Sequence, residues 1–224
     1  EFHHCINVLR LQRGDPITIF NGQGIEMETT INSISKKIAY LTGQKCKQLP
    51  SAKTKIALGQ AIPKGKNMDL IIEKATELGV TQIYPIISER TIIRLNEKES
   101  IKKQEKWQRV AIEACKQSGQ NWLPEVNQPQ KISSIIESTF KEFDLVLIAS
   151  LQEGTEHFKS ILSKIGNTNL ESVLIVIGPE GDLTPSETNK IIEAGAKPMT
   201  LGPITLRSET AAIYAISIIA HELF

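Results

Sequence analysis

The chain has 224 residues, of which 40% are hydrophobic and 23% charged, a composition that is ordinary for a globular protein. The length suits one large domain or two modest ones with a buried core. No apolar run approaches the length of a membrane span, and the first residues lack the pattern of a signal peptide. We therefore expect a cytoplasmic protein that has no membrane partner. Because the chain does not begin with methionine and starts almost inside a structured segment, we also expect native residues to precede Glu1.

The three cysteines, Cys5, Cys46 and Cys115, are odd in number and widely spaced. Their spacing matches neither a disulfide framework nor a set of metal ligands. We expect incidental or buried thiols in a reducing compartment, and no metal site.

Charge is distributed unevenly along the chain. Residues 1–66 contain ten lysines and arginines against four acids, a formal charge of +6, whereas the remainder carries −5. This asymmetry suggests that the first part meets a polyanion, although a merely solvated basic surface explains it equally well.

The first fifty residues are predicted to form a small β-rich domain. Asn21-Gly22 between two apolar runs is typical of a hairpin, and several short strands with tight turns suggest a small barrel. The segment Leu49-Pro50-Ser51 breaks the pattern and predicts a linker, which divides the chain into domains 1–51 and 52–224. The elements expected in the first domain are a short helix over residues 4–11 and strands over 17–20, 25–31 and 37–41.

From about residue 54, strand and helix patterns alternate. This alternation predicts an α/β domain with a mostly parallel sheet and helices on both faces. Thr184 is the expected N-cap of one helix, with Pro185 in its first turn. The expected strands cover residues 56–61, 82–87, 144–149, 173–177 and 197–201, and the helices 68–78, 101–117, 155–165, 185–194 and 208–224.

Two loops near the C-terminus are the most informative segments: Ile177-Gly-Pro-Glu-Gly-Asp-Leu183 and Leu201-Gly-Pro-Ile-Thr-Leu-Arg-Ser-Glu-Thr-Ala211. Each follows a predicted buried strand and precedes a predicted helix, so both should lie side by side at the carboxyl edge of the sheet, where such sheets bind ligands. A single loop of this kind is usually a structural turn, but two at matching strand ends favour a pocket. Glycine lets the backbone approach a ligand closely. A phosphate-binding P-loop and the dinucleotide fingerprint are both absent, which leaves a pocket suited to a nucleoside of low charge.

Arg207, Ser208 and Glu209 stand where the last helix is predicted to start. Ser208 is a plausible N-cap, and Glu209 suits the positive end of the helix dipole. A cation at this end is disfavoured, so Arg207 is expected to have another partner, for instance a carboxylate or an anion in the pocket.

At these loops the sequence resembles the bacterial methyltransferases that modify nitrogen-3 of a uridine in small-subunit (16S) ribosomal RNA, members of the SPOUT superfamily. The resemblance covers nearly the whole chain. It rests on the order and spacing of several motifs, none of them specific alone: His3-His-Cys-Ile-Asn-Val-Leu-Arg10, Gly14-Asp15, Lys64-Gly-Lys-Asn-Met-Asp-Leu70, Lys74-Ala-Thr-Glu-Leu-Gly79, Trp107, Glu113-Ala-Cys-Lys-Gln-Ser-Gly119, Pro124 and the two C-terminal loops.

The resemblance implies an N-terminal PUA-like β-barrel for RNA, a C-terminal domain with a SPOUT-type trefoil knot, and a homodimer. It implies that S-adenosyl-L-methionine is bound by Ala149, Ser150, Leu151, Gly178, Pro179, Glu180, Gly181, Leu201, Gly202, Pro203, Leu206, Arg207, Ser208, Thr210 and Ala211. Residues expected to contact RNA are His3, His4, Arg10, Arg13, Lys64 and Lys66. The chain departs from the family where Asp182 replaces a common glycine, and where Ile204 and Gln120 replace common arginines.

The expected chemistry is in-line transfer of a sulfonium methyl group to a ring nitrogen of small-subunit ribosomal RNA. Arg207 is the candidate for stabilising the anionic base, and Glu209 or Glu180 for accepting its proton. Two alternatives stay open: a related methyltransferase acting on a ribose 2'-hydroxyl or on transfer RNA, and a non-catalytic RNA-binding protein. The target nucleotide, and the choice between free RNA and an assembled subunit, are not determined by the sequence.

Overall fold

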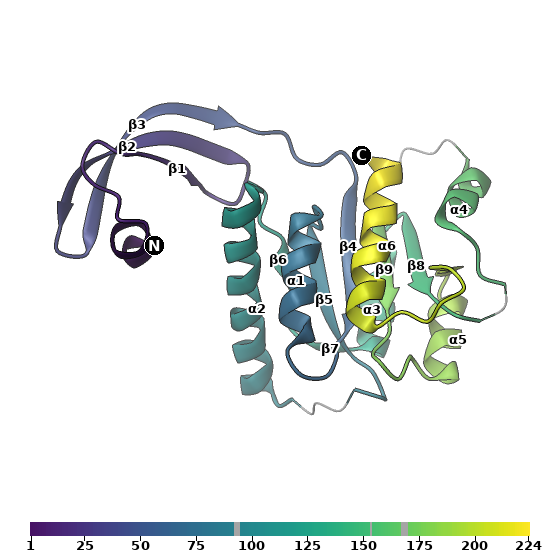
Figure 1. The fold of residues 1–224 in the computed structure, drawn as a ribbon. Helices are drawn as coiled ribbons and strands as arrows, with labels where there is room; N and C mark the ends of the chain where they lie inside the picture. Colours follow the sequence, from purple (N-terminus) through teal and green to yellow (C-terminus); the bar gives the residue numbers. More distant parts are fainter. Residues whose placement is uncertain (92–94, 153, 167–169) are drawn as a thin grey trace. The chain divides into compact units, whose positions relative to one another are not determined.

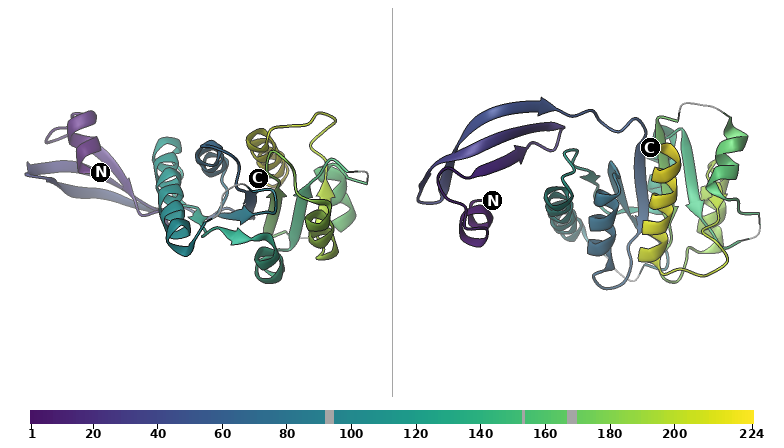
Figure 2. Two further views of the ribbon diagram at one scale, coloured as in Figure 1. Left: turned by 90° about the horizontal axis from the view of Figure 1, so that it is seen from below. Right: turned by 45° about the horizontal axis from the view of Figure 1, so that its top comes forward.

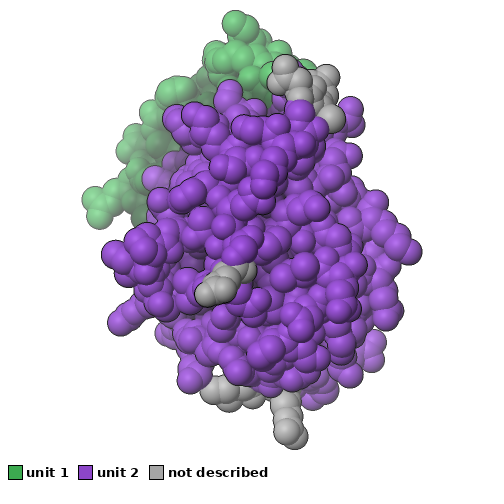
Figure 3. Space-filling model, turned by 90° about the vertical axis from the view of Figure 1, so that its right-hand side faces the viewer, with its two compact units in different colours: residues 1–51 green, residues 52–224 purple. Residues whose placement is uncertain are grey.

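The computed structural model describes residues 1–91, 95–152, 154–166 and 170–224. The chain divides into two compact units, Glu1–Ser51 and Ala52–Phe224, which Figure 3 distinguishes by colour.

The first unit contains a short helix and a three-stranded antiparallel sheet in the order β1-β2-β3. Its first hairpin closes where predicted, because the side-chain oxygen of Asn21 accepts hydrogen bonds from the backbone of Gln23 (2.8 Å) and Ile25 (3.0 Å). A small antiparallel sheet of this kind is consistent with the expected PUA-like unit. The elements are η1 (His3–Val8), β1 (Pro16–Phe20), β2 (Ile25–Ser35) and β3 (Ile38–Gln48).

Strands β2 and β3 extend well beyond their predicted ends. Ser35 pairs with Ile38, so the second hairpin turns through Lys36 and Lys37, with Lys36 in the left-handed region at φ 53°. Most of β3 is exposed. A strand with two solvated faces lacks the alternation of apolar and polar residues that identifies strands in a sequence.

The second unit contains a seven-stranded sheet in the order β10-β8-β9-β4-β5-β6, with β7 also paired to β5. Every neighbouring pair in this sheet is parallel, which confirms the predicted fold class. The strands are β4 (Lys55–Ala61), β5 (Gln82–Ile87), β6 (Glu125–Val126), β7 (Gln130–Lys131), β8 (Leu145–Ala149), β9 (Ser172–Ile177) and β10 (Lys197–Met199) (Figure 1).

Helices cover both faces of this sheet, with α1, α2 and α6 on one face and α3 and α5 on the other (Figure 2). The helices are α1 (Asn67–Glu77), α2 (Glu97–Ser118), α3 (Ile132–Ser138), η2 (Phe140–Glu142), α4 (Phe158–Ile165), α5 (Pro185–Glu193) and α6 (Ser208–Leu223). Among the helices of the described residues, none combines the length and apolar character that crossing a membrane requires.

The central strands are apolar throughout because each supplies both cores. Along β9, Val173 and Ile175 pack in the core beneath α1 and α6, while Leu174 and Val176 pack beneath α3 and α5. Burying each such side chain contributes about 1.5–3 kcal/mol, so the sheet is a firm base for the loops at its carboxyl edge.

Candidate functional site

Three consecutive strands of the sheet end beside one another at its carboxyl edge. Strand β8 lies between β9 and β10 and pairs in parallel with both. The two Gly-Pro loops that follow β9 and β10 were expected on neighbouring strands, but the end of β8 separates them. All three strand ends therefore contribute to one site.

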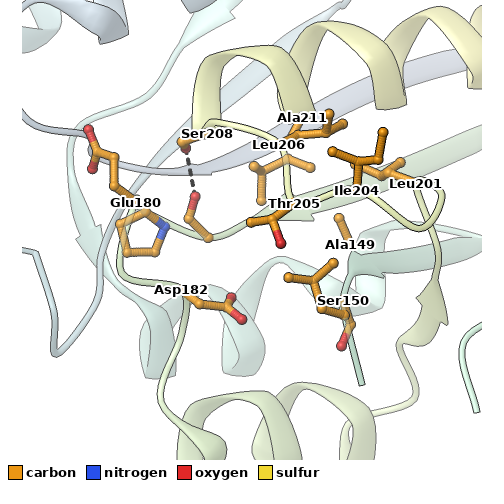
Figure 4. A pocket seen from close by; sticks show the side chains of 14 residues that line it. Ala149, Ser150, Glu180, Asp182, Leu201, Ile204, Thr205, Leu206, Ser208 and Ala211 are labelled. Carbon is orange, nitrogen blue, oxygen red and sulfur yellow. Dashed lines mark hydrogen bonds between the residues drawn. The ribbon is translucent and has the colours of Figure 1, made fainter. Parts of the chain in front are cut away.

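A pocket opens among these strand ends (Figure 4). Most of its walls are apolar side chains and backbone from the two Gly-Pro loops, together with the segment after β8. The residues that line it are Ala149, Ser150, Leu151, Ile177, Gly178, Pro179, Glu180, Asp182, Leu201, Ile204, Thr205, Leu206, Ser208 and Ala211.

Ser208 ties two parts of the pocket together. Its hydroxyl donates to the carbonyl oxygen of Gly178 (2.7 Å; Figure 4) and accepts from the Nε2 of the fully buried Gln60 (2.9 Å). Helix α6 begins at Ser208, and the residue in the cap position is Arg207, which makes no side-chain capping bond. The prediction that Ser208 caps α6 is therefore wrong: its hydroxyl joins the start of α6 to the loop after β9.

Two glycines allow the loops their shape. A Cβ atom on Gly178 would lie 2.9 Å from Oδ1 of Asp182 and 3.3 Å from the backbone nitrogen of Leu183, so the loop after β9 folds too tightly for a side chain there. Gly202 has a φ of +105°, which side-chain-bearing residues rarely adopt. Its backbone nitrogen donates to Oγ1 of Thr200 at 3.1 Å.

Asp182 lines the pocket, although it was not among the predicted cofactor residues. It holds a left-handed backbone conformation at φ 60°, and its Oδ1 accepts a hydrogen bond from the backbone of Leu183 (2.8 Å). The one signal in the sequence that could have identified it is its departure from the glycine that the family resemblance leads one to expect at this position.

The two candidate proton acceptors have different surroundings. Glu180 lines the pocket, and its Oε1 accepts a hydrogen bond from the backbone nitrogen of Lys64 at 3.0 Å. In Figure 4 its carboxylate points away from the other labelled side chains. Glu209 does not line the pocket, and its Oε2 accepts from the side chain of Asn67 at 3.3 Å.

Arg207 is exposed and lies outside the lining of the pocket. Within the described part of the chain, its guanidinium has no hydrogen-bond or ion-pair partner. No carboxylate of the described chain therefore holds it at the start of α6.

The pocket gathers many of the residues predicted to bind the cofactor, from all three segments, but not every one of them. Those outside its lining are Gly181, Gly202, Pro203, Arg207 and Thr210; those that line it without having been predicted are Ile177, Asp182, Ile204 and Thr205.

The residues predicted to contact RNA are all exposed but belong to both units. His3, His4, Arg10 and Arg13 lie in the first unit, whereas Lys64 and Lys66 lie between β4 and α1 of the second. With the division at Ser51, the first unit carries six basic residues against four acids, a charge of only +2. Much of the basic surplus of residues 1–66 therefore belongs to the start of the second unit.

Neither the cysteines nor the His, Asp and Glu side chains of the described residues form a disulfide or a metal site. All three cysteines are free, and burial raises the pKa of the Cys115 thiol to about 11, which keeps it protonated. Over residues 1–91, 95–152, 154–166 and 170–224, no three His, Cys, Asp or Glu side chains gather in a way that could hold a metal ion.

Comparison with known proteins identifies both units. Residues 50–220 match the family model of an RNA methyltransferase domain, and residues 1–42 that of an RNA methyltransferase PUA domain. The ribosomal RNA small subunit methyltransferase E of Bacillus subtilis is 33% identical over 227 residues, covering 99% of this chain and 88% of its own.

Solved structures of methyltransferases are also similar to this chain. A methyltransferase from Legionella pneumophila with bound S-adenosylmethionine has a TM-score of 0.89 and 31% identity, over 99% of this chain and 88% of its own. The ribosomal RNA small subunit methyltransferase E of Neisseria gonorrhoeae, also bound to S-adenosylmethionine, has a TM-score of 0.86 and 31% identity, over 98% and 88%. By its sequence and by its fold, this chain belongs to the RNA methyltransferase family.

Proposed function

We propose that this protein uses S-adenosyl-L-methionine to methylate nitrogen-3 of a specific uridine in small-subunit (16S) ribosomal RNA. The observation that carries the proposal is the pocket at the ends of β8, β9 and β10, in a chain whose relatives are named for methylation of this RNA and include structures with the cofactor bound. These relatives are bacterial, so the proposed activity belongs to the cytoplasm.

The lining of the pocket fits the parts of this cofactor. Leu151, Leu201, Leu206 and Ala211 offer apolar surface for a purine ring, and the backbone of Gly178, which has no side chain, forms part of the pocket wall. The carboxylate of Asp182 suits a positively charged group of the ligand. When bound, the cofactor supplies an electrophilic methyl group.

The acceptor nitrogen of uridine carries a proton at neutral pH, so the protein must help to remove it. Arg207 is unpaired within the described chain and exposed near the pocket residues Leu206 and Ser208, so its guanidinium is available to stabilise negative charge on the uracil carbonyl oxygens. Of the two candidate acceptors, Glu180 is the better placed, because it lines the pocket and Glu209 does not.

We also propose that the protein acts as a homodimer. Leu151 and Ile204 both line the pocket, and 60% and 70% of their surface is exposed. Large apolar side chains together at the mouth of a functional pocket favour a partner surface, and a second copy of the chain fits the symmetric association most common among homo-oligomers. Light scattering on the purified protein would measure its mass in solution.

Mass spectrometry of ribosomal RNA digests from cells with and without the gene tests the activity. Loss of one N3-methyluridine, mapped to a small-subunit fragment, is the expected result. Loss of a ribose methyl group or of a transfer RNA modification would instead support a related methyltransferase. Unchanged RNA would support a non-catalytic RNA-binding protein. Comparing free RNA with small subunits as substrates in vitro would identify which form is methylated.

A further inference from the structure

A second pocket adjoins the first on the other side of the loop after β9. It is lined by residues that follow β4 and β5 and by the loop itself: Ile62, Pro63, Lys64, Arg90, Pro179, Glu180 and Gly181. In the sheet, β9, β4 and β5 are consecutive neighbours, so this pocket continues the same carboxyl edge. Pro179 and Glu180 line both pockets and form their common wall.

The two pockets differ in the charges that line them. Among the described residues that line it, the cofactor pocket has two carboxylates, those of Glu180 and Asp182, and no Lys, Arg or His. The adjoining pocket has two cations, Lys64 and Arg90, with Glu180 in the shared wall. A cationic ligand therefore suits the first pocket, and an anionic one suits the second.

Lys64 is anchored through its backbone and Arg90 through one N–H of its guanidinium, so both keep charged groups available for a ligand. The backbone nitrogen of Lys64 donates to the Glu180 carboxylate at 3.0 Å, so this carboxylate lies beside the β4–α1 loop. The side-chain ammonium of Lys64 has no hydrogen-bond or ion-pair partner among the described residues. Arg90 donates through Nη1 to the carbonyl oxygen of Gly181. A guanidinium has five N–H donors, so others remain for a ligand.

We infer that this adjoining pocket is the acceptor subsite, in which Lys64 and Arg90 bind an RNA backbone phosphate at the target nucleotide. The inference rests on the proposed function, because methyl transfer requires the target base to enter beside the cofactor pocket. A nucleotide taken out of its stack carries its phosphates with it. Arginine and lysine that contact phosphate position the strand, so these two side chains would place the base against the shared wall.

Arg90 also braces the loop through Gly181, so the test must separate that role from phosphate binding. The probe is small-subunit ribosomal RNA extracted from cells that lack the gene. RNA affinity is measured at several salt concentrations, and S-adenosylmethionine affinity by calorimetry, for the wild type, Arg90→Ala and Lys64→Ala. Arg109→Ala is the matched control, because Arg109 is exposed on α2 and lines neither pocket.

Arg90→Ala and Lys64→Ala should each weaken RNA binding about tenfold and lower the salt slope by about 0.7 to 1, with cofactor affinity within about twofold of the wild type. Arg109→Ala should change neither. Loss of cofactor affinity in Arg90→Ala with unchanged RNA binding in both variants would make Arg90 only a brace and overturn the subsite. Methylation is measured separately, so a wild type that binds this RNA without methylating it refutes the proposed function while the binding comparison still decides the subsite. A wild type that does not bind the RNA refutes both.

Discussion

At the scale of single residues, Asp182 gives this pocket a negative charge next to the Gly178–Gly181 turn. Its carboxylate lines a pocket to which no described residue contributes a basic side chain. The backbone at Asp182 is left-handed, a conformation that Asp and Asn tolerate better than most residues. A carboxylate so placed should attract a cationic group of the cofactor, either its sulfonium or its ammonium.

Asp182→Asn should therefore weaken binding of S-adenosylmethionine about tenfold, or about 1.4 kcal/mol. Calorimetry with S-adenosylhomocysteine, which has the ammonium but not the sulfonium, identifies the group: affinity for it falls as well only if Asp182 contacts the ammonium. Asp182→Gly removes the charge and also relieves the backbone, so it should bind like the Asn variant. Wild-type affinity in both variants would contradict the electrostatic role.

Arg207 is expected to act on the chemical step of methyl transfer. Arg207→Ala should slow single-turnover methylation about a hundredfold, the magnitude for losing one preorganised charge stabiliser. Raising the pH should partly restore the rate, since more of the uridine is then deprotonated by solvent. Arg207→Lys should recover little if the two-pronged guanidinium geometry matters. A normal rate at saturating cofactor and RNA would make Arg207 a binding residue and direct attention to Glu180 and Glu209.

At the scale of elements, the start of α5 shows how a loop beside the pocket is anchored. Thr184 and Glu187 form a reciprocal capping box, and Glu187 is buried at 2% exposure. The other oxygen of Glu187 accepts a hydrogen bond from the backbone of Glu89 at 2.8 Å. The box thus connects the segment after β5 to the helix that follows the Gly178–Asp182 loop.

Thr184→Ala should lower the free energy of unfolding by about 1 kcal/mol, the usual effect of losing an N-cap side chain. Thr184→Ser, which keeps the hydroxyl, should lose much less. Urea denaturation of the two variants and the wild type measures both values. Equal stability of Thr184→Ala and the wild type would mean that Glu187 alone holds this end of α5.

Apolar periodicity predicted the helices and the buried strands of the second unit, because each buries a regular face. It gave β5 its observed ends, and Thr184 with Pro185 marked the start of α5 correctly. It missed β6, β7 and α3, since two-residue strands and a seven-residue helix are too short to show a period. It placed the start of α2 at residue 101 rather than Glu97, because the first turn is polar and is fixed instead by the capping box of Asn96 with Glu99.

The alternation of strands and helices predicts that both Gly-Pro loops lie at the carboxyl edge of the sheet, but it does not predict that the end of β8 lies between them. Strand order depends on how crossovers pack, so the position of β8 between β9 and β10 could not be derived from spacing. Ser208 was read as a local cap because a helix start explains a serine without any distant partner. Its actual partners, Gly178 and Gln60, are 30 and 148 residues away in the chain, beyond the reach of local patterns.

At the scale of the whole molecule, the basic residues expected to contact RNA are divided between the two units. Arg10 and Arg13 are exposed in the first unit. Lys64 and Lys66 are exposed in the second, where Lys64 lines the adjoining pocket. If both sets neutralise phosphates, RNA affinity should depend on two separate groups of contacts, and removing either should weaken the dependence on salt.

Arg10→Ala combined with Arg13→Ala should flatten the salt slope of RNA binding by about 1.4 to 2, and Lys64→Ala combined with Lys66→Ala should do the same. The matched control is Lys36→Ala with Lys37→Ala, which removes equal charge from the first unit at its second hairpin. Filter binding over a range of salt concentrations gives each slope. If the slope falls equally in the control, the first unit attracts RNA only through its overall positive charge, because the position of the removed charges would then make no difference. A slope that changes only in the Lys64 and Lys66 variant would confine phosphate binding to the second unit, where Lys64 lines the adjoining pocket.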